Sequence, residues 1–263
     1  MTERKNLPVA LAIAGSDSGG GAGIQADLKT FAALGVHGAC AIACLTAQNP
    51  RRVLGIEPCP PGFLRQQIEA VFEELPPQAV KTGMLFSAQN LFVVARFFQA
   101  KPCPLVVDPV MVSTSGARLL APKAMRVLTE KLLPLAALVT PNLDEAEILS
   151  EQEIRSPEDM RSAAREIHSR FGCAALIKGG HVRRSREAAD IFFDGRNELL
   201  LAAPFVKGVR PHGTGCTCSA AICAALALGN DLPHAVELGK RFVTAAILRS
   251  YKTGGHFALG HCG

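Results

Sequence analysis

Residues 212–219 of this chain read HGTGCTCS, and a run of small, apolar residues, 220–228, follows them directly. The run is apolar on every side, which is typical of a helix that is covered all round, and Gly229 supplies a C-terminal stop. Gly213 and Gly215 allow the backbone to turn tightly and to approach a ligand. Because the first turn of a helix leaves N–H groups unpaired and carries positive dipole, this stretch predicts a binding site for phosphate or for negative charge that develops during a reaction.

Cys216 lies in the field of that helix start, and such a field lowers the pKa of a thiol. The position therefore suits an acid, a base or a nucleophile. A simpler interpretation is a glycine-rich turn followed by a core helix with inert, buried cysteines, because short glycine motifs often occur by chance. The stretch alone leaves both interpretations open.

The composition is typical of a soluble protein built on aliphatic and alanine packing. The length of 263 residues would suit one large α/β domain or two small ones, and we expect residues 1–263 to form a single domain around one core. The net charge is +5 without a dense basic stripe, which favours anionic small molecules as partners over nucleic acid. The apolar run at 7–14 is too short to span a bilayer. Nine cysteines, an odd number, without a secretory signal favour free thiols, so we expect a cytoplasmic protein that binds neither nucleic acid nor membrane.

Strand-like and helix-like segments alternate along the chain. Apolar runs predict strands at 8–14, 38–46, 79–84, 104–107, 135–139 and 173–177. Apolar residues at helical spacing predict helices at 24–35, 61–75, 88–100, 157–171 and 233–251, and a hairpin is expected at 190–193 and 198–202. The alternation favours an α/β fold, in which helices cover both faces of a mostly parallel sheet.

Polar residues and glycines gather where the predicted strands end. These ends read GSDSGGGAG at 15–23, AQNP at 47–50, TGM at 82–84, DPVM at 108–111, TPN at 140–142 and KGGH at 178–181. Open parallel sheets bind their ligands at the carboxyl ends of strands, so we expect a ligand site along this edge. The glycines of the first segment fit neither a Walker loop nor a dinucleotide fingerprint.

Asp27 borders the apolar face of the predicted helix at 24–35. An ionised carboxylate there is costly unless a ligand or a partner pairs with it. Compensation of the helix dipole in the first turn is an equally good interpretation.

Two later features carry less information. The basic loop at 183–186 is most simply a solvated loop, with contact to nucleotide phosphate as the alternative. The two histidines of the tail, His256 and His261, are expected at the surface rather than as ligands.

Several segments, taken together, resemble one family. They are residues 14–30, 46–49, 81–85, 107–111, 140–146, 178–181 and 212–217, and they follow one another in family order across nearly the whole chain. On these motifs the chain resembles the hydroxymethylpyrimidine/phosphomethylpyrimidine kinases of thiamine biosynthesis, within the ribokinase-like superfamily. The resemblance implies a three-layer α/β/α fold, ATP and Mg²⁺ as cofactors, and a homodimer. It also implies two successive phosphoryl transfers, first to 4-amino-5-hydroxymethyl-2-methylpyrimidine and then to its monophosphate.

The resemblance implies roles for individual residues as well. The pyrimidine site would be lined by Gly15, Ala22, Asp27, Gln48 and Met84. Gln48 would form hydrogen bonds with the ring and its amino group.

For the nucleotide and the metal, the resemblance points to the later strand ends. Asn142 and Glu145 match an Asn-x-x-Glu element that places magnesium and phosphate in the superfamily. Lys178 and Thr214 would lie near the nucleotide phosphates, and Asp108 near the metal or the triphosphate. Asn142 with Glu145 also has the spacing of a helix cap, which is the structural alternative.

The catalytic residues implied in this way are Gly213, Gly215, Lys178 and Cys216, which stands where much of the superfamily has an aspartate base. Phosphoryl transfer needs alignment of the attacking oxygen and neutralisation of charge on the transferred group. We therefore expect the 213–216 helix start to neutralise that charge. Cys216 is expected to accept or steer the hydroxyl proton in the first transfer.

Two other functions are alternatives. A pyridoxal or pyridoxine kinase of the same superfamily would act on a ring that also carries a hydroxymethyl group, and some of these kinases share the Gly-Thr-Gly-Cys turn. A non-catalytic sensor would keep the pocket to bind a vitamin precursor and regulate a partner. The full set of phosphate-handling residues argues against the sensor.

Overall fold

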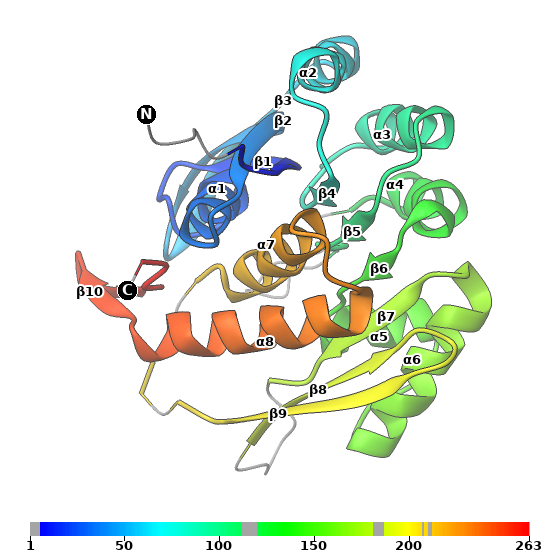
Figure 1. Ribbon diagram of the computed structural model, residues 1–263, viewed down its shortest axis with the longest axis vertical. Coiled ribbons are helices and arrows are strands. Elements are labelled where there is room, and N and C mark those ends of the chain that lie inside the picture. Colours follow the sequence, from blue (N-terminus) through cyan, green and yellow to red (C-terminus); the bar gives the residue numbers. More distant parts are fainter. Residues whose placement is uncertain (1–5, 112–119, 181–186, 207, 210–211, 263) are drawn as a thin grey trace.

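One main sheet crosses the molecule, and the helices pack on its two faces (Figure 1). The computed structural model describes residues 6–111, 120–180, 187–206, 208–209 and 212–262. Among these residues, nine strands form the sheet in the order β3-β2-β1-β4-β5-β6-β7-β8-β9. Their bounds are Val9–Asp17 (β1), His37–Asn49 (β2), Arg52–Pro58 (β3), Ala79–Thr82 (β4), Leu105–Val107 (β5), Leu138–Val139 (β6), Ala174–Lys178 (β7), Glu187–Phe193 (β8) and Glu198–Pro204 (β9).

The central strands of this sheet run parallel. Neighbouring strands are parallel from β2 through β1, β4, β5 and β6 to β7. At one edge β3 is antiparallel to β2, and at the other β8 is antiparallel to both β7 and β9. The mostly parallel sheet is thus confirmed. The carboxyl ends of the parallel strands meet along one edge, where the sequence places its polar segments.

Helices cover both faces of the sheet, so the expected three-layer α/β/α fold is confirmed (Figure 1). Their bounds are Gly23–Ala33 (α1), Pro61–Glu74 (α2), Ala88–Ala100 (α3), Pro122–Val127 (α4), Leu143–Ser150 (α5), Pro157–Phe171 (α6), Thr214–Ala227 (α7) and Leu232–Leu248 (α8). Along β1 the side chains alternate between two cores. Ala10 and Ala12 belong to the core under α1, α7 and α8, and Leu11 and Ile13 to the core under α2–α6.

The helix that the sequence singles out, α7, is buried along most of its length. Each residue from 217 to 225 is at most 3% exposed. Its many alanines let the helix lie close to the sheet, and Gly229 ends it in a left-handed conformation, with φ of +88°. The predicted helix, covered all round and stopped by glycine, is therefore confirmed.

Several predicted boundaries in the sheet are wrong. β1 continues to Asp17 rather than ending at residue 14, because 15–17 pair with 44–46 after a register shift. The sequence does not predict β3, since its side chains are mostly exposed and show no clear apolar alternation. The strand expected at 135–139 is only Leu138–Val139, and a helical segment from α4 through a π turn and a 3₁₀ turn, Leu133–Leu135, precedes it.

The C-terminal segment also differs from the prediction. The last helix ends at Leu248 rather than at 251, and Tyr251–Thr253 (β10) pairs with His256–Ala258 (β11) in a small ribbon. His261 is not at the surface but 7% exposed, with Nε2 3.0 Å from Oγ1 of Thr217. The tail thus packs against the first turn of α7. The loop at 183–186 lies outside the described residues.

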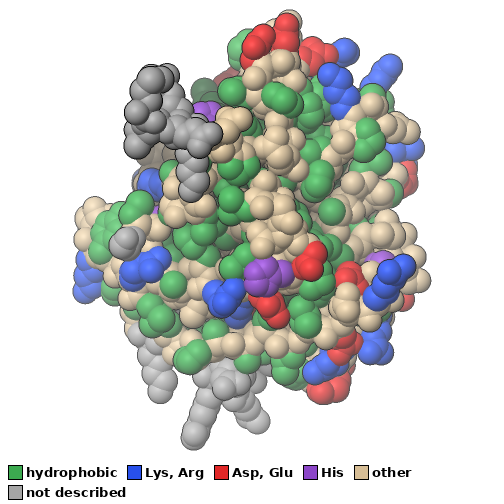
Figure 2. Space-filling model, in the orientation of Figure 1, with side chains coloured by type: hydrophobic (Ala, Val, Ile, Leu, Met, Phe, Trp, Pro, Cys, Tyr) green, Lys and Arg blue, Asp and Glu red, His purple; other side chains and the backbone are tan. Residues whose placement is uncertain are grey.

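The described surface shows mixed charge. On the face drawn in Figure 2, lysine and arginine side chains are interspersed with acidic and apolar ones rather than gathered into a band. No helix in the described part of the chain is long and apolar enough to cross a membrane.

The contact between α7 and α8 depends on a missing side chain at Gly239, where an added Cβ would overlap Cγ1 of Ile222. We expect Gly239→Ala to lower the free energy of unfolding by about 1–3 kcal/mol, as overpacked cores do. Gly62→Ala is the matched control, because Gly62 lies in α2 and faces open space. It should raise the free energy of unfolding by up to about 1 kcal/mol. Urea titrations followed by circular dichroism measure both, and equal effects of the two variants would contradict the packing argument.

Candidate active site

The start of α7 is fitted against the glycine loop that follows β1. Gly213 caps the helix with φ of +87°, a left-handed conformation that favours glycine, and an added Cβ would overlap the carbonyl oxygen of Gly21. The first helical hydrogen bond runs from the N–H of Thr217 to the carbonyl of Gly213, at 2.9 Å. The N–H groups of 214–216 therefore precede the helical ladder. They carry the positive end of the dipole toward the strand ends.

Asp17 holds the glycine loop in shape. Its carboxylate accepts hydrogen bonds from the N–H groups of Gly19 at 2.8 Å, Gly21 at 3.1 Å and Ala22 at 2.8 Å, and the side chain is 3% exposed. The sequence analysis gives Asp17 no role. The local signal for this role of Asp17 is an aspartate that precedes glycines in a turn.

Gly15 and Met84 lie side by side beneath the loop. The N–H of Gly15 donates to the carbonyl of Met84 at 3.0 Å. A Cβ on Gly15 would lie 3.1 Å from Cε of Met84 and 2.8 Å from Sγ of Cys44. A side chain at Gly15 would thus displace one of these two neighbours.

Gln48 meets a histidine from the far end of the chain. Its amide nitrogen Nε2 lies 2.8 Å from Nε2 of His212, which is also 3.6 Å from a carboxylate oxygen of Asp17. His212 belongs to the motif that precedes α7, yet the sequence analysis assigns it no function. The contact joins the end of β2, the glycine loop and the start of α7.

Asp27 forms a buried ion pair with Lys81. Nζ of Lys81 lies 2.8 and 2.9 Å from the two carboxylate oxygens, and both side chains are fully buried. Burial raises the pKa of the Asp27 carboxyl to about 6, while the Lys81 charge acts in the opposite direction. The partner that the sequence requires is therefore a lysine of β4, and the first-turn dipole interpretation is wrong because Asp27 lies beyond the first turn of α1.

The expected lowering of the Cys216 pKa is wrong. Burial raises the pKa of this thiol to about 11, and the charges of Asp27 and Asp108 add to the effect. The Lys81 charge and the N–H of Gly23 act in the lowering direction but are outweighed. At neutral pH the side chain is therefore a neutral thiol.

Asp108 and Lys178 form a second ion pair, beside the start of α7. Nζ of Lys178 lies 3.2 Å from one carboxylate oxygen of Asp108, and the other oxygen accepts a hydrogen bond from Oγ of Ser219 at 3.3 Å. A Cβ on Gly215 would lie 3.2 Å from Nζ of Lys178. Burial opposes the charge on Lys178, but the charges of Asp108 and Glu145 outweigh burial and raise its pKa. The site therefore holds a permanent cation next to the open N–H groups of α7.

Asn142 and Glu145 cap α5. The Asn142 side chain accepts from the N–H of Glu145 at 2.9 Å, and the two carboxylate oxygens of Glu145 accept from the N–H groups of Asn142 and Met111, each at 3.0 Å. The helix-cap interpretation is thus confirmed. Burial raises the pKa of Glu145, and the Asp108 charge adds to that rise. Each carboxylate oxygen of Glu145 keeps further acceptor capacity.

Some of the oxygen ligands that a cation needs lie together at the carboxyl ends of β5 and β6. Thr140 follows β6 beside Asp108, and its buried hydroxyl has no hydrogen-bond partner in the described part of the chain. Together with the carboxylates of Asp108 and Glu145, this orphaned oxygen fits a hard cation such as Mg²⁺. Among the described residues no three His, Cys, Asp or Glu side chains could hold a metal alone. Mg²⁺ at this place would need oxygens from phosphate and water, which is its usual habit.

The structure brings most of the predicted residues together in two groups. The first group surrounds the glycine loop and consists of Gly15, Ala22, Gln48 and Met84. The second follows β5, β6 and β7 and consists of Asp108, Asn142, Glu145 and Lys178. The start of α7, with Thr214 as its first residue, lies between them, since Gly213 contacts the first group and Gly215 the second. Asp27 is the exception, because its side chain has no exposed surface.

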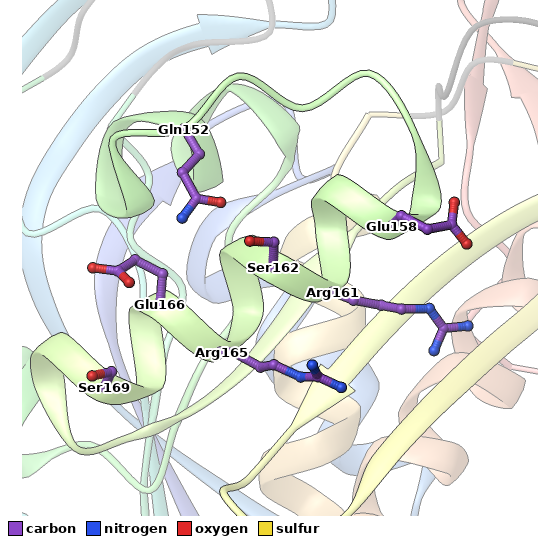
Figure 3. Close-up of a pocket in the computed structure, with 7 residues that line it drawn as sticks. All are labelled: Gln152, Glu158, Arg161, Ser162, Arg165, Glu166 and Ser169. Carbon is purple, nitrogen blue, oxygen red and sulfur yellow. The ribbon is translucent and has the colours of Figure 1, made fainter.

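A separate hollow of about 500 Å³ lies on α6 (Figure 3). It is lined by Gln152, Glu158, Arg161, Ser162, Arg165, Glu166 and Ser169. Arg161 and Arg165 both bind Glu198 of β9, so their charges are already satisfied. None of the predicted site residues lines this hollow.

Comparison with known proteins places the chain among vitamin kinases. A family model described as phosphomethylpyrimidine kinase matches residues 17–260. A hydroxymethylpyrimidine/phosphomethylpyrimidine kinase of Synechococcus elongatus is 45% identical over 256 residues, which cover 97% of each chain. The thiamine biosynthesis bifunctional protein ThiED of Geobacter sulfurreducens is 46% identical over 95% of this chain, which spans 51% of that protein. The ADP complex of Bacillus subtilis pyridoxal kinase superposes with a TM-score of 0.90 at 36% identity, covering 97% of this chain and 98% of that one.

The neutral Cys216 thiol can be tested by its reactivity. Since only the thiolate is alkylated, the rate of Cys216 modification by iodoacetamide should keep rising with pH up to about 11. Mass spectrometry of the modified peptides follows each cysteine separately. The exposed Cys262 serves as an internal control for reagent and accessibility. A rate at Cys216 that levels off near neutral pH would contradict the burial argument.

Proposed function

The chain belongs to the phosphomethylpyrimidine kinase family, and we propose that it catalyses both phosphorylations of the thiamine pyrimidine. The fold is ribokinase-like. ATP phosphorylates 4-amino-5-hydroxymethyl-2-methylpyrimidine first, and a second ATP converts the monophosphate to the diphosphate. One observation carries the proposal: the open N–H groups of α7 lie between the group of residues around the glycine loop and a second group that holds a lysine and two carboxylates.

We place the acceptor at the glycine loop. Gly15 and Ala22 contribute little side-chain bulk, Met84 contributes a flexible apolar side chain, and Gln48 offers an amide that forms hydrogen bonds with a ring nitrogen and an amino group. Asp27 lies beneath this surface and would act on the acceptor only indirectly, because its buried carboxylate is bound by Lys81. The hydroxymethyl group, or its phosphate, would then point toward the start of α7.

We place the phosphates of ATP at the other group. Lys178 would hold the β- and γ-phosphates, with Asn142 and Thr214 close by, and Asp108 and Glu145 would hold Mg²⁺ together with the phosphates. When bound, Mg²⁺ neutralises charge on the phosphate oxygens. The N–H groups at Gly213 and Gly215 would neutralise charge on the transferred group.

We propose that the role of Cys216 differs between the two phosphoryl transfers. A phosphoryl transfer with a loose transition state needs little help from a base before the new bond forms. A neutral thiol next to the acceptor would therefore steer the hydroxyl group and its proton in the first step. In the second step the attacking group is a phosphate, which carries no proton that a base must remove first.

A pyridoxal or pyridoxine kinase is the second candidate, because the fold superposes closely on a pyridoxal kinase. A sensor that binds a precursor without turnover is the third. The ring that is phosphorylated separates the first two, and the absence of ATP turnover would identify the third.

The assignment predicts the products of purified enzyme with MgATP. The pyrimidine alcohol should give the monophosphate and then the diphosphate, and the supplied monophosphate should give the diphosphate. ADP release and product masses measure both steps, with pyridoxal and pyridoxine offered in parallel. Phosphorylation of pyridoxal or pyridoxine alone would refute the pyrimidine assignment.

The steering role of Cys216 predicts a split between the two steps. Cys216→Ser should lower turnover of the alcohol roughly tenfold to a hundredfold, as misplaced reacting groups do, and should leave turnover of the monophosphate nearly unchanged. Steady-state kinetics with each acceptor measure the split. Full turnover of the alcohol by a normally folded variant would show that Cys216 has no part in the first step.

We also propose that residues 1–263 work as one cytoplasmic domain. One main sheet joins β1 to β9 among the described residues, and all nine cysteines of the chain are free, which is typical of a reducing compartment.

We propose further that this kinase is a homodimer through the β3 edge of the sheet. Leu45, Val53 and Leu54 are 54%, 44% and 62% exposed on the outermost two strands, where apolar side chains and an open strand edge favour self-association. Leu54→Asp should shift the mass measured by light scattering from dimer to monomer. Leu248→Asp, on a leucine that is 68% exposed at the end of α8, is the control and should leave the dimer intact. A monomeric wild-type enzyme would refute this proposal.

A further inference from the structure

A third buried ion pair, Asp190 with Lys240, lies outside the machinery described above. Nζ of Lys240 is 2.8 Å from Oδ2 of Asp190 and 2.9 Å from the carbonyl oxygen of Ala188. Asp190 is 5% exposed and Lys240 is 9% exposed. The pair joins β8 to α8, on the same side of the sheet as α7.

Asp190 stands directly opposite Lys178. The two residues are register partners in the antiparallel pair of β7 and β8, so their side chains emerge on the same face of the sheet. Opposite charges in such positions normally bind each other. Here Lys178 reaches away to Asp108, at 3.2 Å, and Asp190 binds Lys240.

The second oxygen of Asp190 is used as well. Oδ1 accepts a hydrogen bond from the N–H of Gly179 at 3.0 Å. Gly179 is the residue after Lys178, and an added Cβ there would overlap the carbonyl oxygen of Ala189. Asp190 therefore fixes the backbone that carries Lys178, while the Lys178 ammonium pairs with Asp108 instead.

Charge explains why Lys240 is needed for this arrangement. A buried carboxylate stays ionised only next to a cation, and the cations that act on Asp190 are Lys240 and Lys178. Without Lys240, the unpaired carboxylate would attract Lys178, its cross-strand partner. Lys178 would then leave Asp108 and the start of α7.

We propose that Lys240 is a positioning residue for the nucleotide phosphates, because it occupies Asp190 and so keeps Lys178 directed at Asp108 and the start of α7. The inference rests on the proposed function, in which Lys178 binds phosphate. It assigns α8 a part in catalysis although no residue of that helix touches the site.

The test first removes the Lys240 charge. It then also removes the Asp190 carboxylate, whose attraction for Lys178 the Lys240 charge masks. Lys240→Gln deletes the charge and keeps a donor for the Ala188 carbonyl, and Lys240→Met deletes both. We expect each to raise the KM for ATP roughly tenfold or more, with the KM for the pyrimidine alcohol within about twofold of wild type. The double variant Asp190→Asn/Lys240→Met should bring the KM for ATP back to within about threefold of wild type, because no carboxylate is left to attract Lys178.

A purely structural role gives the opposite pattern. The double variant would then be as impaired as Lys240→Met, or both KM values would rise together with a loss of thermal stability, and either result overturns the proposal. If Lys240→Met does not fold, Lys240→Gln and the double variant decide in the same way.

A crystal structure of Lys240→Gln gives a readout that does not depend on activity. Nζ of Lys178 should lie near Asp190 in that structure, and an unmoved Lys178 refutes the inference. Failure of the proposed function appears separately, as wild-type enzyme that phosphorylates neither pyrimidine acceptor.

Discussion

The contact between Gly213 and the carbonyl of Gly21 determines how near α7 comes to the rest of the site. Any side chain at Gly213 would overlap that carbonyl. The helix start and the glycine loop can touch only because residue 213 has no side chain. The loop in turn keeps its shape through the hydrogen bonds of Asp17. Once this contact is made, Gly215 faces Lys178 and Cys216 faces the Asp27–Lys81 pair. The two groups of site residues thus share one backbone junction.

Three lysine–aspartate pairs lie in a row on the α7 side of the sheet. They are Asp27 with Lys81, Asp108 with Lys178, and Asp190 with Lys240. Buried ion pairs are poor stabilisers, because desolvation offsets most of their attraction, so stability alone does not account for the row. Lys178 of the middle pair is the most exposed of the three lysines, since its side chain is 17% exposed against 11% for Lys240 and 0% for Lys81. This difference in exposure agrees with the proposal that Lys178 binds phosphate and that the other two lysines act on their neighbouring carboxylates.

The sequence predicts what local pattern controls. The helices at 61–75, 88–100 and 157–171 agree with the structure to within a residue, because their apolar spacing and their capping residues are local. β3 is not predicted, since an exposed edge strand has little apolar pattern.

For the site, the positions of the motifs at strand ends follow from the parallel sheet, but the partners of Asp27 and Asp17 do not. The pKa of Cys216 shows the reason most clearly. The helix start, which by itself would lower that pKa, is visible in the sequence. The burial and the carboxylates of Asp27 and Asp108 that raise it are set by the fold. The functional roles of the site residues stay predictions.

The place of β1 in the sheet has a consequence for synthesis on the ribosome. β1 precedes every other described strand of the sheet in the chain, yet it lies in the interior of the sheet between β2 and β4. Its alanines at positions 10 and 12 are covered by a core that includes α7 and α8, which follow β1–β9 in the chain. Until α7 and α8 are translated, the part of this sheet face that they cover stays exposed on the nascent chain. Such a face is a binding surface for chaperones and a source of aggregation when translation stalls.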